Sequence, residues 1–249
     1  MKFKLVILAA GKGKRMNSDI PKALTPVGGK PILQYLHESA IASGISRPIV
    51  VIGHERNRLC EAFGGDCDYV VQEEQLGTGH AVMITKDAVG DADALMVLYG
   101  DHPFISAESM KKLATRHEQD KNILTLMTTR LPDFEGWRKA FTHWSRIIRD
   151  ESGRMTRDVQ YKDSTEEEKK ITEVNPCIYC FDTKWLWEHI ARLKNENAQK
   201  EYYLTDLIGM AVAEGHTLSS IDVAPEEVIG INTQEEREIA EELLRSTRR

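Results

Sequence analysis

The sequence predicts an α/β protein with a Rossmann-like, mostly parallel sheet flanked by helices. Short apolar runs alternate along the chain with segments of helical periodicity, which is the pattern of βα units. The run over residues 4–10 is apolar at almost every position, as expected for a strand buried on both faces. Gly11 and Asp101 each come after the carboxyl end of such a run, and ligands of parallel sheets bind beyond the carboxyl ends of the strands.

The chain has 249 residues, 41% of them hydrophobic, which is enough for one domain with a sizeable core. We expect strands over residues 4–10, 48–53, 69–71, 94–99 and 123–129. We expect helices over 31–43, from about 55, over 79–89, and over 106–117 with Ser106 as N-cap. Farther along we expect strands over 145–149, 154–161, 171–181 and 218–223, and helices over 204–214 and 233–245. Residues 131–205 lose the regular alternation and are interpreted as a small lobe within the single domain, residues 1–249.

The composition excludes several classes of function. A formal net charge of −6 argues against broad nucleic-acid binding, which needs a basic face. The apolar runs are too short to cross a bilayer, so we expect a soluble cytoplasmic protein without a membrane partner. Its four cysteines form no disulfide pattern, and the C-x-x-C from Cys177 to Cys180 lies in an expected buried strand, where two core thiols are favoured over a metal or redox role.

The first loop, Leu8-Ala-Ala-Gly-Lys-Gly-Lys-Arg-Met16, has the composition of a phosphate site. Small residues allow a phosphate to approach the backbone N–H groups, and basic side chains add charge. It is neither a Walker A loop nor a dinucleotide fingerprint, because no Gly-Lys-Ser/Thr closes it and Met16 occupies the third glycine position. Taken alone it also fits an exposed basic turn, but Lys22 follows six residues later and is a suitable point charge for phosphate.

The stretch LAAGKGKRMNSDIPKAL resembles sugar-1-phosphate nucleotidyltransferases, and most of all the uridylyltransferase domain of bacterial bifunctional N-acetylglucosamine-1-phosphate uridylyltransferases. Further blocks occur in the same order as in that family. They are the Gln-rich stretch 72–81, Leu98-Tyr-Gly-Asp-His-Pro103, the block 197–206 and Ile229-Gly-Ile-Asn232. The chain contains no hexapeptide repeats like those of the family's acetyltransferase domain, so acetyl transfer is not expected from these residues.

The resemblance implies a GT-A-like nucleotidyltransferase fold that uses Mg²⁺, UTP and a sugar 1-phosphate. It assigns catalysis to Arg15 and Lys22, and the metal to Asp101 and Asn232. It assigns nucleotide binding to Leu8, Ala9, Ala10, Gly11, Gln72, Gly77, Thr78, Tyr99 and Gly100, and sugar binding to Ser145, Gln160 and Asn175. The implied reaction is attack of the sugar phosphate on the α-phosphorus of UTP, with pyrophosphate leaving. Because a phosphate monoester has its second pKa near ~6, this nucleophile needs no general base.

Three departures from the family fall on the sugar side. His143-Trp-Ser-Arg146 stands for Gly-Tyr-Gly-Arg, Val159-Gln-Tyr-Lys-Asp163 for Val-Glu-His-Lys-Asp, and Asn175-Pro-Cys177 for Asn-Thr-Gly. N-acetylglucosamine 1-phosphate is the first expectation, and other hexose or N-acetylhexosamine 1-phosphates are alternatives. Two further alternatives are a nucleotidyltransferase for CTP or GTP, which the Gln-rich stretch disfavours, and a related glycosyltransferase, which would normally carry Asp-x-Asp where this chain has Asp101-His-Pro. A non-catalytic nucleotide sensor of the same fold also remains open.

Overall fold

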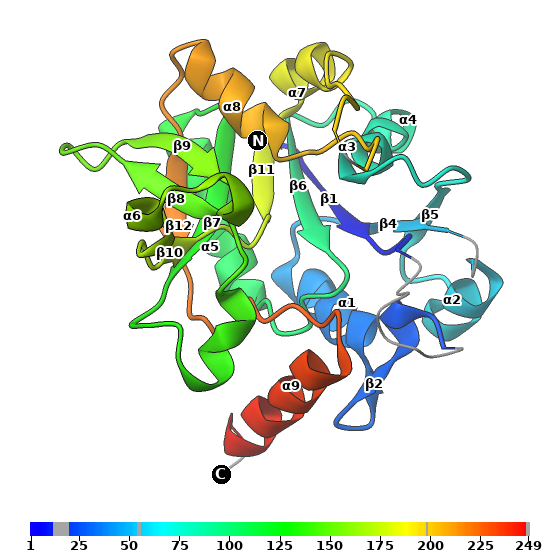
Figure 1. Cartoon of the computed structure of the whole chain (residues 1–249). Helices are drawn as coiled ribbons and strands as arrows, with labels where there is room; N and C mark the ends of the chain where they lie inside the picture. The colour runs from blue at the N-terminus through cyan, green and yellow to red at the C-terminus, as the bar shows by residue number, and fades with distance from the viewer. Residues whose placement is uncertain (12–19, 54–55, 198, 248–249) are drawn as a thin grey trace.

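The computed structural model describes residues 1–11, 20–53, 56–197 and 199–247 (Figure 1). These residues form a ten-stranded mixed sheet, and β12 (Ser219–Asp222) pairs with β7 off the main path. The strand order along that path is β5 (Asp68–Val71), β4 (Ile49–Ile52), β1 (Phe3–Leu8), β6 (Ala94–Tyr99), β11 (Tyr179–Asp182), β7 (Leu124–Arg130), β10 (Glu173–Val174), β8 (Arg146–Arg149), β9 (Met155–Val159). β2 (Pro26–Val27) and β3 (Lys30–Pro31) form a separate ribbon. The predicted α/β class, with a mostly parallel central sheet, is confirmed.

β1 lies at the centre of the parallel part. It pairs in parallel with β4 and with β6, so that Val6 lies between Ile49 and Val97. β11 enters antiparallel between β6 and β7, which is why the sheet is mixed. The carboxyl ends of β1 and β6 therefore lie next to each other, at the same edge of the sheet.

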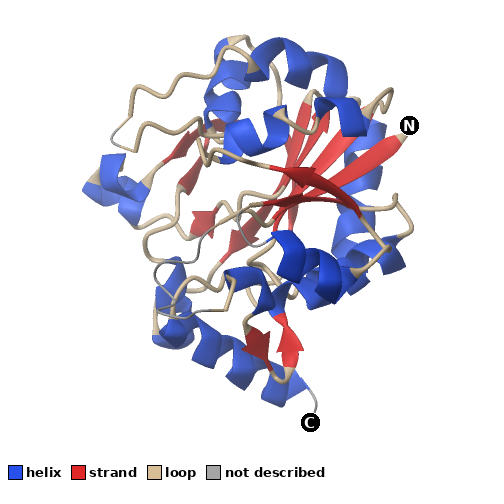
Figure 2. Cartoon of the chain, turned by 90° about the vertical axis from the view of Figure 1, so that its right-hand side faces the viewer, coloured by secondary structure: helices blue, strands red, loops and turns tan. Residues whose placement is uncertain are grey.

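Both faces of this sheet are buried, which explains the uninterrupted apolar runs in the sequence. Leu5 and Ile7 contribute to one core and Val6 to the other, because successive strand side chains point to opposite faces. The helices that cover the first face are α1 (Ile32–Ser43), α2 (Arg56–Phe63) and α5 (Ala107–Asp120). Those on the second face are α3 (Thr78–Met83), α4 (Lys86–Val89), α7 (Thr183–Ile190) and α8 (Asp206–Ala213). Figure 2 shows helices on both sides of the strands.

Most expected elements are present, with instructive differences. Ser106 caps α5, its hydroxyl accepting a hydrogen bond from the Ser109 N–H at 3.1 Å. The single helix expected over residues 79–89 is split into α3 and α4 at Thr85, whose buried hydroxyl donates to the Val82 carbonyl. Helix α7 was not expected, and α9 (Gln234–Thr247) ends the described chain. In the described residues no helix is long and apolar enough to span a membrane.

The strand expected over residues 171–181 is wrong as a continuous element. It is interrupted between β10 and β11, because the Asn175 side-chain oxygen accepts a hydrogen bond from the Cys177 N–H at 2.7 Å and Cys177 adopts φ 63°. The C-x-x-C motif thus has its first cysteine in this turn and its second in β11. Within the range 131–205, β11 pairs in the main sheet and α7 packs on its second core, and the small lobe stays a prediction.

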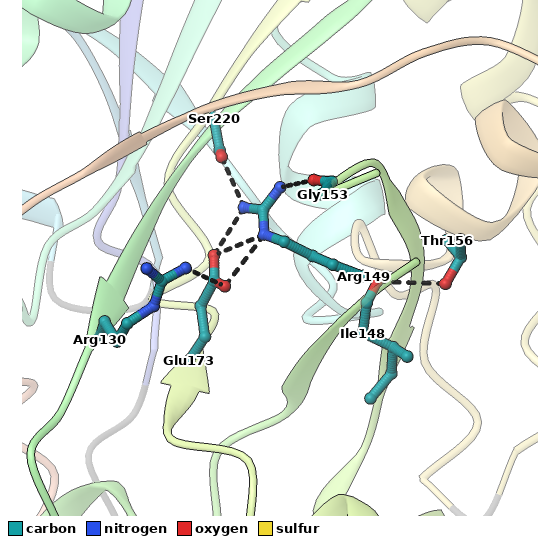
Figure 3. Close-up of polar contacts among 7 residues, drawn as sticks. All are labelled: Arg130, Ile148, Arg149, Gly153, Thr156, Glu173 and Ser220. Carbon is teal, nitrogen blue, oxygen red and sulfur yellow. Dashed lines mark hydrogen bonds and ion pairs between the residues drawn. The ribbon is translucent and has the colours of Figure 1, made fainter. Parts of the chain in front are cut away.

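A buried carboxylate joins the irregular part of the chain to the main sheet (Figure 3). Glu173 on β10 is bound by Arg149 of β8 at 2.6 Å and by Arg130 of β7 at 2.8 Å. Arg149 also donates to the Ser220 hydroxyl of β12 at 2.8 Å. Glu173 and its two arginine partners therefore connect four strands, β7, β8, β10 and β12. Around β8 and β9 lie the 3-10 turns 136–141 and 161–163 and the short helix α6 (Glu166–Lys169), and a third 3-10 turn covers 22–24.

Candidate active site

The residues predicted to bind nucleotide lie together around one cavity of about 230 Å³. β1 delivers the first of them at its carboxyl end, and β6 delivers Tyr99 and Gly100 at its own. The Gln-rich loop after β5 closes the cavity from the side. All nine predicted residues line it: Leu8, Ala9, Ala10, Gly11, Gln72, Gly77, Thr78, Tyr99 and Gly100. Their individual roles stay predictions.

The Gln-rich loop is fixed by backbone contacts with the segment before α8. The Tyr202 carbonyl accepts from the Gly79 N–H at 2.8 Å, and the Tyr202 N–H donates to the Leu76 carbonyl at 2.8 Å. Gly77 adopts φ 101° and ψ 179°, a region open almost only to glycine, and a Cβ there would lie 2.7 Å from the Tyr202 carbonyl oxygen. The loop can approach this segment only because residue 77 has no side chain.

Gln72 is 5% exposed and faces the cavity from the base of this loop. Its amide nitrogen donates to the Gly77 carbonyl at 3.1 Å and lies 3.1 Å from Nδ1 of His80. With its amide hydrogens engaged inside the protein, the group that Gln72 retains for a ligand is its carbonyl oxygen, an acceptor.

A compact charged cluster lies where this cavity meets a second one. Lys22 Nζ donates to Asp101 Oδ2 at 2.6 Å and to Asn232 Oδ1 at 2.7 Å. Burial opposes the ionisation of Asp101, but the charges of Lys22 and His102 and the hydrogen bond from Lys22 outweigh it and hold the pKa of Asp101 at about 2. Asp101 is therefore an anion at neutral pH.

These residues fit the predicted magnesium ion. Two oxygens converge on one cationic atom, the Lys22 ammonium, so this point already accommodates a positive charge. Mg²⁺ takes one or two protein oxygens and completes its shell with phosphates and water. No group of three or more His, Cys, Asp or Glu side chains suited to a metal occurs among the described residues.

The second cavity, of about 210 Å³, shares Tyr99 with the first. It brings together all three predicted sugar-binding residues, Ser145, Gln160 and Asn175, and the predicted metal ligand Asn232. Two histidines, His102 and His143, and Trp144 complete its polar and aromatic lining. Two adjacent cavities with a cationic junction are the arrangement needed to join two phosphorylated molecules.

The family described as MobA-like NTP transferase domain matches residues 5–206. The chain belongs to this family. Its membership confirms the prediction of a nucleotidyltransferase, while magnesium and a cytoplasmic location stay predictions.

The relatives of this MobA-like transferase agree in sequence over nearly its whole length. The bifunctional protein GlmU of Desulfotalea psychrophila is 41% identical over 247 residues, which are 98% of this chain and 71% of the relative. GlmU of Clostridioides difficile is 39% identical over 246 residues, 98% of this chain and 52% of the relative. GlmU of Brevibacillus brevis is 39% identical over 233 residues, 93% of this chain and 49% of the relative. The chain spans about half the length of these last two proteins.

Solved structures share its fold at low sequence identity. One is the structure of a protein from Bacillus anthracis assigned as a glucose-1-phosphate thymidylyltransferase, in complex with sucrose. It has a TM-score of 0.78 at 19% identity, and the match covers 98% of this chain and 95% of the chain in that structure. A CMP:2-keto-3-deoxy-manno-octonic acid synthetase complexed with CTP has a TM-score of 0.71 at 18% identity. The match covers 99% of this chain and 100% of the chain in that structure. At these identities the likeness establishes the fold.

One residue predicted for the site cannot be placed, and two residues that line the first cavity were not predicted. Arg15 lies outside the described residues. Gln75 and Glu201 also line the first cavity, and Gln75 donates to the Ala10 carbonyl. Both stand in blocks that the resemblance had singled out, the stretches 72–81 and 197–206, so a signal for them was present in the sequence.

Proposed function

We propose that this MobA-like transferase is a uridylyltransferase that joins UTP and a sugar 1-phosphate into a UDP-sugar and releases pyrophosphate. The observation that carries the proposal is the junction of the two cavities. Lys22 and Asp101 line the first cavity, and Asn232 lines the second. The Lys22 ammonium donates to the side-chain oxygens of Asp101 and Asn232. A positive charge at that boundary lies where an α-phosphate from one side would meet a sugar phosphate from the other.

Uracil is the base that suits the first cavity. The Gln72 oxygen accepts a hydrogen bond, and the imide N–H of uracil is a donor on an otherwise acceptor-rich edge. The sharp turn at Gly77 brings backbone close to that edge. For the acceptor we propose N-acetylglucosamine 1-phosphate, with other hexose or N-acetylhexosamine 1-phosphates as the alternatives, since the relatives of 39–41% identity are GlmU proteins and the sugar-side residues Ser145 and Gln160 depart from the family pattern.

Catalysis of this reaction depends mainly on positioning the two substrates and neutralising the charge on their phosphates. The sugar phosphate is ionised at neutral pH, so no residue has to remove a proton from it. Asp101 and Asn232 would hold Mg²⁺, which supplies charge neutralisation on the phosphates when bound. Lys22 holds both of these oxygens in place and is the described cation nearest the boundary, so we assign it to the developing charge on the phosphates. Arg15 is assigned the same role by the family motif alone.

The test is pyrophosphate release from UTP, CTP and GTP with a panel of sugar 1-phosphates in the presence of Mg²⁺. Release with UTP and N-acetylglucosamine 1-phosphate is the expected result. Asp101→Ala should lower turnover by at least about 100-fold, whereas Asp66→Ala, at an exposed aspartate that lines neither cavity, should match the wild type. UTP binding without release for any sugar would instead support a nucleotide sensor, and wild-type turnover in Asp101→Ala would remove the metal assignment.

A further inference from the structure

A buried cation without a carboxylate partner lies beside the second cavity, and nothing in the proposed reaction uses it. Arg146 is the first residue of β8, and its side chain is fully buried. Among the described residues, no ion pair within 4 Å includes Arg146, whereas Arg149 on the same strand pairs with Glu173. A buried charge without a counter-charge is costly, so its presence calls for an explanation.

The Arg146 guanidinium is bound by backbone carbonyls instead. Nη1 donates to the Trp144 carbonyl at 2.5 Å, and Nη2 donates to the Thr142 carbonyl at 2.9 Å. Nε and Nη2 both lie 3.4 Å from the carbonyl oxygen of Lys169, at the end of α6. Arginine carries its N–H groups in a rigid planar fork, so one side chain can bind several carbonyls at once. Arg146 thereby ties together three places in the chain that lie outside the strands.

Two aromatic rings hold the same guanidinium. Its central carbon lies 4.5 Å from the centre of the Phe134 ring and 5.2 Å from the centre of the Tyr161 ring. These are distances of cation–π contacts, which stabilise a guanidinium that is removed from water. The Tyr161 ring in turn meets the His143 ring edge to face, with the two ring centroids 4.9 Å apart. The orientation of the guanidinium is therefore fixed both by its hydrogen bonds and by the rings.

The segments that Arg146 holds form part of the wall of the second cavity. Residues 143–145 line this cavity, and they lie in the chain between the Thr142 carbonyl, which Arg146 binds, and Arg146 itself. Gln160 also lines the cavity and directly precedes Tyr161, whose ring contacts the guanidinium. Two stretches of the wall are thus attached to one buried side chain.

Asn175 is joined to the same segment. Its N–H donates to the Ser145 carbonyl at 3.3 Å, and the preceding residue, Val174, pairs with Arg146 between β10 and β8. The three predicted sugar-binding residues therefore all lie next to Arg146 or to a residue that contacts it. Arg146 itself is not among the described residues that line the cavity, so it can act on a ligand only through its neighbours.

We propose that Arg146 is a positioning residue for the acceptor: its buried guanidinium fixes residues 143–145 and the turn that begins at Tyr161, and thereby sets the shape of the cavity that receives the sugar 1-phosphate. The inference rests on the proposed function. It requires the planar fork and not the charge alone, because an ammonium on a flexible stem does not match several carbonyls at once. Neither segment lines the first cavity, so the binding of UTP should not depend on Arg146.

The experiment compares two arginines of β8. Arg146→Lys keeps the positive charge and loses the fork. Arg149→Lys makes the same change at a residue that lines neither cavity and binds Glu173. For the full-length chain and both variants, kcat and the KM for the acceptor are measured by pyrophosphate release at saturating UTP, with the sugar 1-phosphate that the wild type turns over best. The Kd for UTP is measured by calorimetry, and the urea midpoint reports stability.

Arg146→Lys should raise the KM for the acceptor at least about tenfold, because a displaced cavity wall fits the substrate less well. The change in kcat should stay within about threefold, and the Kd for UTP should not change, because the residues at the junction of the cavities are untouched. Arg149→Lys should lower the urea midpoint and leave the KM for the acceptor unchanged. A wild-type acceptor KM in folded Arg146→Lys overturns the inference, and so does an equal rise in Arg149→Lys, which would trace the effect to lost stability alone.

Tyr161 provides a second measurement if Arg146→Lys does not fold. Tyr161→Leu removes a ring from the guanidinium, whereas Tyr161→Phe keeps that ring. The KM for the acceptor should be at least about threefold higher in Tyr161→Leu than in Tyr161→Phe, and equal values in the two folded variants overturn the inference.

The two proposals fail differently. Absence of release with every sugar 1-phosphate defeats the proposed function, whereas turnover with an unaltered acceptor KM in Arg146→Lys defeats this inference alone.

Discussion

Replacing Gly77 by alanine tests whether the Gln-rich loop sets the affinity for the nucleotide. Gly77 adopts φ 101° and ψ 179°. The added methyl group would lie 2.7 Å from the backbone oxygen of Tyr202 and 2.9 Å from the backbone nitrogen of the same residue. Both contacts are with backbone, which cannot swing aside as a side-chain end can. The loop must therefore move away from the segment that carries Tyr202.

The size of the effect follows from two costs. An L-residue in this region of backbone space costs roughly 1–3 kcal/mol, and the contact with Tyr202 adds to it unless the loop moves. Moving breaks the bond from the Gln72 amide to the Gly77 carbonyl at 3.1 Å and that from the Gly79 N–H to the Tyr202 carbonyl at 2.8 Å. Each such bond contributes about 1 kcal/mol, so we expect Gly77→Ala to raise the KM for UTP about tenfold and to lower the free energy of unfolding by about 2–3 kcal/mol.

The assay is the KM for UTP at saturating sugar 1-phosphate, together with urea unfolding. Gly209→Ala is the matched control: Gly209 lies exposed in α8, and a Cβ there would meet no atom within 4 Å. It should leave the KM unchanged and stabilise the protein by roughly 0.5–1 kcal/mol, because alanine favours helix. A wild-type KM for UTP in Gly77→Ala would refute the assignment of this loop to the nucleotide.

Three further predictions concern charge and stability. Lys22→Ala should lower kcat at least about 100-fold at saturating substrates, and turnover near that of the wild type would contradict its role at the phosphates. Burial lowers the pKa of His117 to about 4; the unfolded chain takes up this proton below about pH 6.5, so stability should fall by up to about 3 kcal/mol as pH drops from 6.5 to 4. Urea unfolding across that range should show this loss in the wild type and not in His117→Gln. Glu173→Gln removes the negative charge that Arg130 and Arg149 share (Figure 3). It should lower the free energy of unfolding by about 2–3 kcal/mol at pH 7. An unchanged urea midpoint would show that these ion pairs contribute nothing to stability.

The nucleotide half of the site was predictable because local sequence controls it. A nearly continuous apolar run such as residues 4–10 predicts a strand buried on both faces, and the residue after it is then expected at the carboxyl edge of the sheet. Gly11 and Asp101 follow two strands that pair directly in the sheet, and this pairing brings both residues to the same edge. The exact strand ends, and the split of the helix at Thr85, depend on individual hydrogen bonds that periodicity does not encode.

The acceptor half is set by contacts between segments that are far apart in the chain, and there residue identity alone misleads. Asn175 lies in the predicted cavity, yet its amide hydrogens are turned to Asp158 and Tyr179. No local pattern marks Asp158 as buried, because it stands among charged residues and is covered only when β9 packs beside the turn at Asn175. Arg146 looked like the start of an ordinary strand, and it is enclosed by carbonyls and rings that include Phe134 and Tyr161. What the cavity presents to a sugar therefore depends on which of its polar groups are already bonded within the protein, as both amide hydrogens of Asn175 are.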